Sequence, residues 1–154
     1  MKFICPLITV TDIDRSRHFY ENLLHQKVKY DFGENVTFHG DFAIHLKSHF
    51  KELIGNKEIK EGGNNFELYF EFDDVEKLVN VLKDKHVAFV HELREQPWKQ
   101  KVVRFYDPDN NIIEVGESME HLVCRLKKAG QSIEQISGLT GMSVTMVNEL
   151  IEKK

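Results

Sequence analysis

The sequence predicts an α+β fold: two βαβββ repeats paired about a pseudo-twofold axis into an open cup-like sheet, followed by a C-terminal helical extension. Three observations predict it. At an offset of 62 residues, segment 7–14 aligns with segment 69–76, and each copy is an alternating strand that ends at an aspartate. Each copy continues into an amphipathic helix and then into three short β-rich pieces. From Ser118 onward the pattern becomes helical throughout.

Composition excludes several classes of protein. With 154 residues, 41% hydrophobic and 30% charged, the chain fits one globular domain or two small fused units. It has no apolar run of membrane-spanning length, and its short apolar N-terminus reads as a strand and not as a signal peptide. The net charge of −4 argues against a broad nucleic-acid or membrane surface. Two cysteines, Cys5 and Cys124, form no disulfide framework, so we expect a cytoplasmic protein.

Each repeat predicts the same order of elements. Asp12 and Asp73 are the expected N-caps of two helices, over residues 13–24 and 75–84. The strands that follow are expected at 28–32, 35–39 and 42–46, and at 87–93, 102–106 and 112–116. A strong turn signal occupies 107–111, before the last strand. The resulting organisation is repeat one over 3–47, a linker over 48–65, repeat two over 66–117, and the helical extension over 118–154.

The strand alternation predicts one apolar and one polar face for each sheet. Ile4, Ile8 and Val10 are expected on the core side of the first strand, with Cys5 opposite; His45 and Glu114 likewise oppose apolar neighbours. Polar groups at the centres of strands are costly if they are buried without a purpose, although such a face can also simply be exposed to water.

The repeat also predicts that four side chains of metal-ligand type converge. Cys5 and Glu67 occupy the same position in the two copies, 62 residues apart. His45 and Glu114 both lie midway along the last strand of their copies. If the two polar faces meet around a cleft, these four side chains come together there.

Three segments of the chain resemble the vicinal oxygen chelate superfamily, which includes glyoxalase I, bleomycin-resistance proteins, fosfomycin-resistance thiol transferases and extradiol dioxygenases. The segments are Val10–Glu21, Phe70–Val75 and Phe105–Glu114. The last segment is the most specific, because Asp107-Pro108-Asp109 precedes a strand that carries a glutamate; Asn110 takes the place of the usual glycine and tolerates the same positive φ. The resemblance covers about residues 3–117.

The resemblance implies a divalent metal ion (Zn, Mn, Fe or Ni) bound by His45, Glu67, Glu114 and Cys5, with Glu67 and Glu114 catalytic. Relative to glyoxalase I, Glu114 keeps its residue type, whereas Glu67 and Cys5 take histidine positions and His45 takes a glutamate position. Imidazole, carboxylate and thiolate groups all bind divalent cations. The implied activity is that of a metal-dependent lyase or transferase of glyoxalase type, in which the metal chelates a small oxygenated substrate.

Other interpretations of these residues stay open. Cys5 can be an inert packed residue, His45 a histidine hydrogen-bonded within a sheet, and Glu67 a solvent-facing strand residue. The alternative function is a metal-free binding protein for a flat or drug-like ligand, of the bleomycin-resistance type. A third is a ligand-sensing regulator that uses the extension on DNA.

A substrate pocket is expected around the cleft, lined by Tyr69, Trp98, Gln100 and Arg104. Trp98 can form an aromatic wall or merely cap the sheet, and Gln100 can contact the ligand. Arg104 can orient an anionic group or only neutralise Glu67 or Glu114.

The extension predicts three helices. One has an apolar stripe from Met119 to Leu126, the second begins with a capping box at Ser132, and the third begins at Ser143. The last two resemble a helix-turn-helix, but the final helix is acidic, with Lys153 and Lys154 only at its end, so we predict a packing role and no nucleic-acid binding. Its helices are expected to cover a sheet edge, close over the pocket or pair subunits. We expect a homodimer; the cleft forms within one chain or between exchanged halves.

Overall fold

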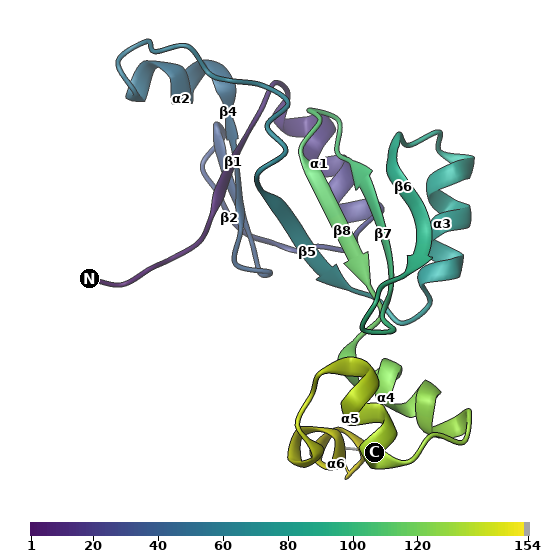
Figure 1. Ribbon diagram of the computed structural model, residues 1–154. Helices are drawn as coiled ribbons and strands as arrows, with labels where there is room; N and C mark the ends of the chain where they lie inside the picture. The colour runs from purple at the N-terminus through teal and green to yellow at the C-terminus, as the bar shows by residue number, and fades with distance from the viewer. Residues whose placement is uncertain (153–154) are drawn as a thin grey trace. The chain divides into compact units, whose positions relative to one another are not determined.

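The computed structural model describes residues 1–152, which fall into two compact units (Figure 1). Unit one comprises residues 1–66 and 106–111, and unit two comprises residues 67–105 and the chain from Ile112 onward. Lys153 and Lys154 lie outside the described residues. Over residues 1–152, none of the helices has the length and apolar character needed to cross a membrane. Cys5 and Cys124 are both free thiols.

Unit one contains the first βαβββ repeat. Its elements are β1 (Leu7–Val10), α1 (Ile13–Asn22), β2 (Val28–Asp31), β3 (Asn35–Phe38) and β4 (Ala43–Leu46). They form a mixed sheet in the order β1-β4-β3-β2, in which β1 runs parallel to β4 and the other pairs are antiparallel. Helix α1 packs on β3 and β4, where Tyr20 contacts the rings of Phe38 and Phe42 with centroid separations of 5.6 and 5.2 Å.

Unit two repeats this topology. Its elements are β5 (Glu67–Glu71), α3 (Val75–Asp84), β6 (Phe89–Glu95), β7 (Lys101–Tyr106) and β8 (Ile112–Gly116). The sheet order is β5-β8-β7-β6, with β5 parallel to β8. Helix α3 lies beside β6 (Figure 1) and buries its apolar stripe, which consists of Val75, Leu78, Val79 and Leu82. The predicted α+β fold with two βαβββ modules and a helical extension is therefore confirmed.

The helix caps agree with the sequence in one repeat and differ in the other. Asp12 caps α1 as predicted, because its carboxylate accepts from the Arg15 amide at 2.9 Å. In the second repeat the N-cap is Asp74 and not Asp73. Asp73 instead accepts hydrogen bonds from the amide and hydroxyl of Ser118, and these bonds lower the pKa of its carboxyl group. This aspartate therefore anchors the start of the extension.

The first strand begins later than predicted. Pro6 has no amide hydrogen, and its carbonyl accepts from the Ala43 amide just before the β1–β4 ladder starts at Leu7. Cys5 consequently lies outside the strand, and Ile4 is exposed and not part of the core. Ile8 and Val10 are buried as the alternation predicts.

The predicted linker begins with a helix that the sequence did not indicate. Helix α2 (Lys47–Leu53) follows β4 directly and packs on β4 and β1. Its N-cap is Leu46, which offers no side-chain acceptor, and seven residues are too few to show an amphipathic period. This helix covers the side of β4 that carries His45, so His45 is buried and only 7% exposed.

The turn at 107–111 belongs to unit one, although it lies far along the chain. Buried Asp107 accepts from the Tyr20 hydroxyl at 2.8 Å and from the Asn111 amide at 2.8 Å. Burial raises the pKa of Asp107, and these donors oppose that rise. Asp109 accepts from the Thr11 amide at 3.0 Å and pairs with Arg15 at 3.0 Å. Burial of Asp109 is outweighed by these contacts, so its pKa is lowered.

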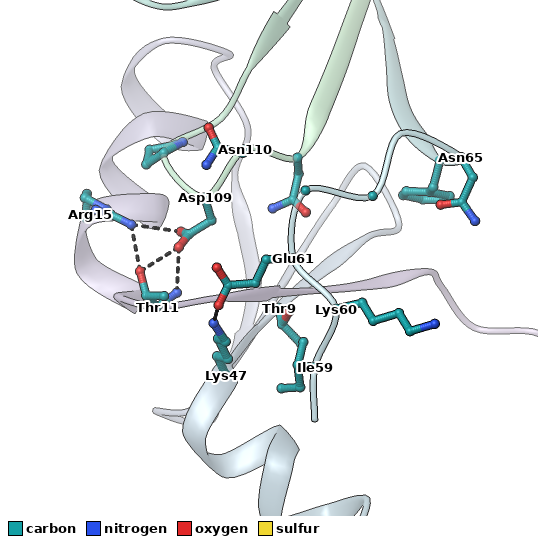
Figure 2. A pocket seen from close by; sticks show the side chains of 15 residues that line it. Thr9, Thr11, Arg15, Lys47, Ile59, Lys60, Glu61, Asn65, Asp109 and Asn110 are labelled. Atoms are coloured by element: carbon teal, nitrogen blue, oxygen red, sulfur yellow. Dashed lines mark hydrogen bonds and ion pairs between the residues drawn. The ribbon is translucent and has the colours of Figure 1, made fainter. Parts of the chain in front are cut away.

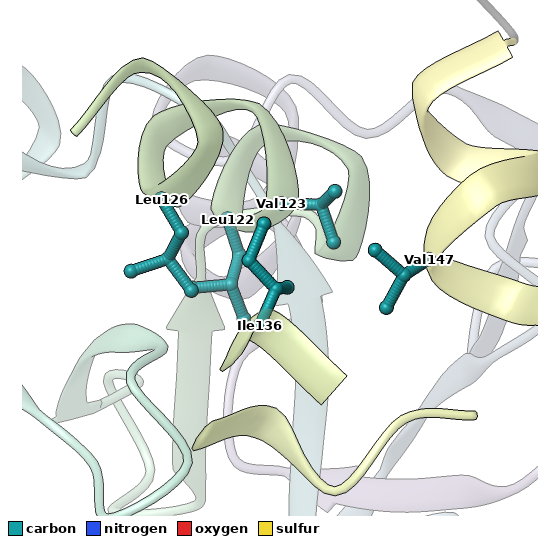
Figure 3. Close-up of a cluster of buried hydrophobic side chains, with 5 residues drawn as sticks. All are labelled: Leu122, Val123, Leu126, Ile136 and Val147. Atoms are coloured by element: carbon teal, nitrogen blue, oxygen red, sulfur yellow. The ribbon is translucent and has the colours of Figure 1, made fainter. Parts of the chain in front are cut away.

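The extension folds into three helices that bury their apolar stripes against one another. They are α4 (Met119–Lys128), α5 (Ile133–Thr140) and α6 (Val144–Glu152). Figure 3 shows the shared cluster, which consists of Leu122, Val123, Leu126, Ile136 and Val147. The predicted capping box at Ser132 is present, closed by Gln135. These stripes find their partner surface within the extension.

A buried ion pair joins the extension to the sheet of unit two. Glu117 is almost fully buried and accepts from the Lys101 amide at 2.9 Å and from Arg125 Nε at 3.0 Å. Arg125 also donates to the Lys99 carbonyl at 2.7 Å. The bond to Glu117 raises the pKa of Arg125. Loss of Arg125 would leave the buried Glu117 carboxylate without this charged partner.

Two valines of α6 provide a matched test of the extension core. Val147 is fully buried and Val144 is 43% exposed. Both Val→Ala changes alter helix propensity in the same direction, so burial is the main difference between them. We expect Val147→Ala to lower the free energy of unfolding by about 2 kcal/mol and Val144→Ala to change it by less than about 0.5 kcal/mol. Urea denaturation measures both; equal effects would contradict this packing.

Asp109 predicts a pH dependence of stability. Because its folded pKa is lowered, its carboxylate stabilises the fold above the unfolded pKa of about 3.9, and this contribution is lost as pH falls through the folded pKa. Asp109→Asn should lower the free energy of unfolding by about 1–2 kcal/mol at pH 7, and by progressively less below about pH 4. Urea denaturation of both proteins across pH 3–7 measures the difference, with exposed Asp84→Asn as control. If the two free energies of unfolding differ as much at pH 3 as at pH 7, the charge of Asp109 is not the cause of the difference.

Candidate functional site

One face of the unit-two sheet carries the polar side chains. Tyr69 lies opposite Glu114 in the parallel β5–β8 pair, and Glu67 precedes Tyr69 by two residues on the same face. On β7, Arg104 is paired with His91 of β6. The opposite face is apolar, as buried Leu68, Ile113 and Val115 show. The predicted separation into a polar and an apolar face is therefore present in unit two.

Arg104 holds the two candidate catalytic carboxylates. Its Nε donates to Glu67 Oε2 at 2.8 Å, and its Nη2 pairs with Glu114 Oε2. Its Nη1 lies 3.2 Å from His91 Nε2. Glu114 is buried and Glu67 is more open. Arg104 is therefore ion-paired with both glutamates at once.

The other three residues expected in the substrate pocket form one hydrogen-bonded chain. Trp98 Nε1 donates to Gln100 Oε1 at 2.9 Å, and Gln100 Nε2 donates to the Tyr69 hydroxyl at 2.9 Å. Burial raises the pKa of Tyr69 to about 12, so the phenol stays protonated. A Cβ at Gly116 would lie 2.7 Å from Gln100 Nε2, so this close approach requires glycine. The chain brings Tyr69, Trp98 and Gln100 beside the carboxylate face.

In unit one, His45 has different partners from those predicted. Its Nε2 lies 2.9 Å from His49 Nδ1, and its Nδ1 lies 3.2 Å from Asn35 Nδ2. The ring also packs edge-on against Phe50 of α2. Burial, followed by the neighbouring His49, lowers the pKa of His45. His45 is thus a buried histidine with both ring nitrogens engaged.

The strand register in the two units does not give the four candidate ligands the equivalent positions that the repeat predicted, because the pairing differs by two residues. Thr9 lies opposite His45, four residues after Cys5, whereas Tyr69 lies opposite Glu114, two residues after Glu67. These offsets span about 13 and 7 Å of extended chain. Glu67 therefore lies close to Glu114 on the neighbouring strand, whereas Cys5 lies too far along the chain to be equally close to His45.

The residues of each unit do not fit a divalent ion as they are arranged. Residues 1–152 contain no group of three or more His, Cys, Asp or Glu side chains that could hold a metal. Arg104 occupies the position between Glu67 and Glu114 that a cation would take, and His45 is bonded to His49 and Asn35. A metal at the carboxylates would have to displace the guanidinium.

Unit one also contains a cavity of about 350 Å³, shown in Figure 2. The start of α1, the end of β1, the segment 59–66 and the turn 108–111 line it. Its charges are mostly paired: Arg15 bonds Asp109, and Lys47 pairs with Glu61. Thr9, Lys60 and Asn65 add further polar groups to its wall. This volume lies at the small end of the range for ligand pockets.

Sequence reasoning missed His49, His91 and the cavity. The His45–His49 spacing of four residues was visible, but it signals proximity only once a helix is known to start at Lys47. His91 meets Arg104 through the β6–β7 register, which shifts twice along the pair and cannot be read from alternation. The cavity depends on residues of the linker and of a distant turn.

Comparison with known proteins places this chain in a family. The family model described as a glyoxalase-like domain matches residues 3–120. A crystal structure of a protein of unknown function from Agrobacterium tumefaciens str. C58 is 43% identical, with a TM-score of 0.70, and the match covers 77% of this chain and 95% of that one. The uncharacterized protein YraH of Bacillus subtilis (strain 168) is 27% identical over 128 residues, which cover 75% of this chain and 97% of YraH.

A third comparison concerns the fold alone. The fosfomycin resistance protein FosX from Listeria monocytogenes, solved in complex with Mn(II) and sulfate, is 18% identical with a TM-score of 0.60, over 81% of this chain and 97% of that one. The family model, which matches residues 3–120, confirms the resemblance that the sequence predicted over about residues 3–117. Because the family model spans most of the chain, this protein belongs to the glyoxalase-like domain family of the vicinal oxygen chelate superfamily.

Proposed function

We propose that this protein binds a small molecule on the polar face of the unit-two sheet without using a metal ion there. The single observation that carries the proposal is the Arg104 guanidinium between Glu67 and Glu114. These carboxylates already have a cationic partner, so no second cation is needed to offset their repulsion. The Glu114 carboxylate is buried, so displacing Arg104 would leave its charge without a compensating partner.

The charge of this face indicates the class of ligand. Glu67, Glu71 and Glu114 contribute three negative charges, and Arg104 and Arg94, which the β6–β7 register places on the same face, contribute two positive charges, so the acidic groups are in excess by one. Such a face favours a ligand that carries positive charge or several hydrogen-bond donors. The face also offers hydrogen-bond acceptors, since the Glu67 carboxylate is partly open to solvent.

Two aromatic side chains beside these carboxylates favour a ligand with a flat apolar part. Tyr69 is 46% exposed and Trp98 is 40% exposed, and Gln100 links them by hydrogen bonds. Aromatic rings held in this way bury apolar area with little loss of side-chain freedom, and they attract cations over their faces. The proposed ligand is therefore a flat aromatic cation.

A second candidate is the metal-dependent lyase or transferase acting on a small oxygenated substrate. Glu67 and Glu114 lie diagonally on one face of neighbouring strands, as two carboxylate ligands could. FosX, which shares the fold, was solved with Mn(II). For this chain, metal binding by Cys5, His45, Glu67 and Glu114 requires release of Arg104 and pairing of the two units' polar faces. The homodimer and the cytoplasmic location belong to the same set of proposals; light scattering tests the first.

Calorimetric titration with Mn²⁺ separates the two candidates. We expect wild-type protein to show no saturable Mn²⁺ binding, because Arg104 already compensates the carboxylates. Arg104→Gln frees both groups and should gain binding, which the double variant with Glu114→Gln should lose. Stoichiometric Mn²⁺ binding by the wild type that Glu114→Gln abolishes would establish the metal-dependent candidate in place of ours.

The fluorescence of Trp98, the single tryptophan, reports ligand binding at this face. We expect proflavine, a flat cation, to quench Trp98 saturably and naphthalene-2-sulfonate, a flat anion, to do so far more weakly. Glu114→Gln removes one charge from the face and should weaken proflavine about five- to tenfold. Asp84→Asn removes a charge from an exposed site elsewhere and is the matched control.

Two results would contradict this ligand class. One is equal binding of the cation and the anion. The other is a loss of binding in Lys60→Met but not in Glu114→Gln, which would move the ligand to the unit-one cavity.

A further inference from the structure

We infer that Arg125 of helix α4 is a positioning residue for the proposed ligand site: it holds the loop that carries Trp98, so the extension is part of that site. The loop consists of residues 96–100, which join β6 to β7. All of the residues involved belong to unit two. The inference rests on the proposed function, because Trp98 is one of the two aromatic side chains that the proposal places against the ligand.

Arg125 contacts the backbone of this loop directly. Its Nη2 donates to the Lys99 carbonyl at 2.7 Å. Lys99 has a φ of 72°, in the left-handed region that residues other than glycine seldom adopt. Two bonds within the loop support this turn: the Lys99 amide donates to the Gln96 carbonyl at 2.8 Å, and the Gln96 amide donates to the Gln100 carbonyl at 2.8 Å. The Arg125 bond adds a contact from a different element, at the residue that follows Trp98.

Gln100 links the extension to both aromatic side chains. Its buried Nε2 donates to the Glu117 carbonyl at 2.8 Å and to the Tyr69 hydroxyl at 2.9 Å. Its Oε1 accepts from Trp98 Nε1 at 2.9 Å. Both protons of this amide are used, which fixes its orientation. The backbone of Glu117, just before the extension, therefore helps to set where the two aromatic rings lie.

The position of Glu117 depends in turn on Arg125. The buried Glu117 carboxylate accepts from Arg125 Nε at 3.0 Å and from the Lys101 amide at 2.9 Å, and the Glu117 amide donates to the Lys101 carbonyl at 3.0 Å. Arg125 thus holds the loop at two points, at Lys99 directly and at Gln100 through Glu117. An aromatic side chain that is already held in place loses less freedom on binding, which strengthens binding of the ligand.

Time-resolved fluorescence anisotropy of Trp98, the single tryptophan, tests the inference on the full chain without a ligand. Arg125→Met should enlarge the fast, nanosecond component of the decay about twofold. The double variant Arg125→Met/Glu117→Gln should do the same, and it leaves no uncompensated charge at this ion pair. Lys128→Met removes an exposed cation from the same helix and should leave the decay unchanged. Circular dichroism checks that each variant folds.

Titration with proflavine connects the position of Trp98 with affinity. Both variants at Arg125 should bind proflavine about fivefold more weakly than wild type, because Trp98 must then be ordered on binding. The double variant keeps the net charge of the protein, so its loss of affinity is not an effect of charge. Lys128→Met should bind as the wild type does.

The inference is overturned if the double variant shows the wild-type anisotropy decay. It is equally overturned if Trp98 becomes more mobile while proflavine binds as tightly as to wild type. A wild-type protein that does not bind proflavine contradicts the proposed ligand class instead, and the anisotropy decay then still decides whether Arg125 holds the loop.

Discussion

A carboxylate can be buried in a protein only with partners that replace its hydration, and three buried acids organise this molecule. Glu114 is held by Arg104 on the polar face of the unit-two sheet. Glu117 is held by Arg125 and by the Lys101 amide, where the helical extension leaves that sheet. Asp107 is held by Tyr20 and Asn111 in the turn that belongs to unit one. The polar face, the extension and the distant turn each depend on one of these groups.

The same constraint bears on function. Where two carboxylates lie close together, either a metal ion or a basic side chain can offset their mutual repulsion. A metal ion can also act on a substrate as a Lewis acid, whereas a basic side chain only provides charge and hydrogen bonds. Here Arg104 is ion-paired with both Glu67 and Glu114, and our proposal of a metal-free binding surface rests on that contact. The arginine lies on β7, which neighbours the strand of Glu114 and is two strands away from the strand of Glu67. Family membership specifies the fold, whereas the function depends on the side chains that the fold brings together at the site.

Unit one differs from unit two at the equivalent place. After β4 the chain turns at once into α2, which covers His45 and supplies His49 and Phe50 as its neighbours. After β8 the chain runs instead into Glu117 and the extension, which leaves Tyr69 and Trp98 partly exposed. Two repeats of one topology thus present different chemistry, because the segments that follow their last strands differ.

The sequence by itself determined the two repeats, the element order, the core faces of most strands, and the three helices of the extension. These follow from local periodicity, capping residues and turn chemistry, all of which act over a few neighbouring positions. It also indicated Tyr69, Trp98, Gln100 and Arg104 as residues of one neighbourhood, and Glu67 and Glu114 on one face. It did not show the late start of β1 after Pro6, nor α2, whose seven residues carry no period and no capping side chain.

Only the tertiary structure determined which side chains contact one another. The strand register places Thr9, and not Cys5, opposite His45, and it brings His91 to Arg104 across a pair with two register shifts. Arg104 with its two glutamates, and Asp73 with Ser118, join segments that are far apart in sequence. His49 meets His45 only because α2 packs back on β4. Alternation assigns a side chain to a face, but the position of its partner along that face is set by register and packing.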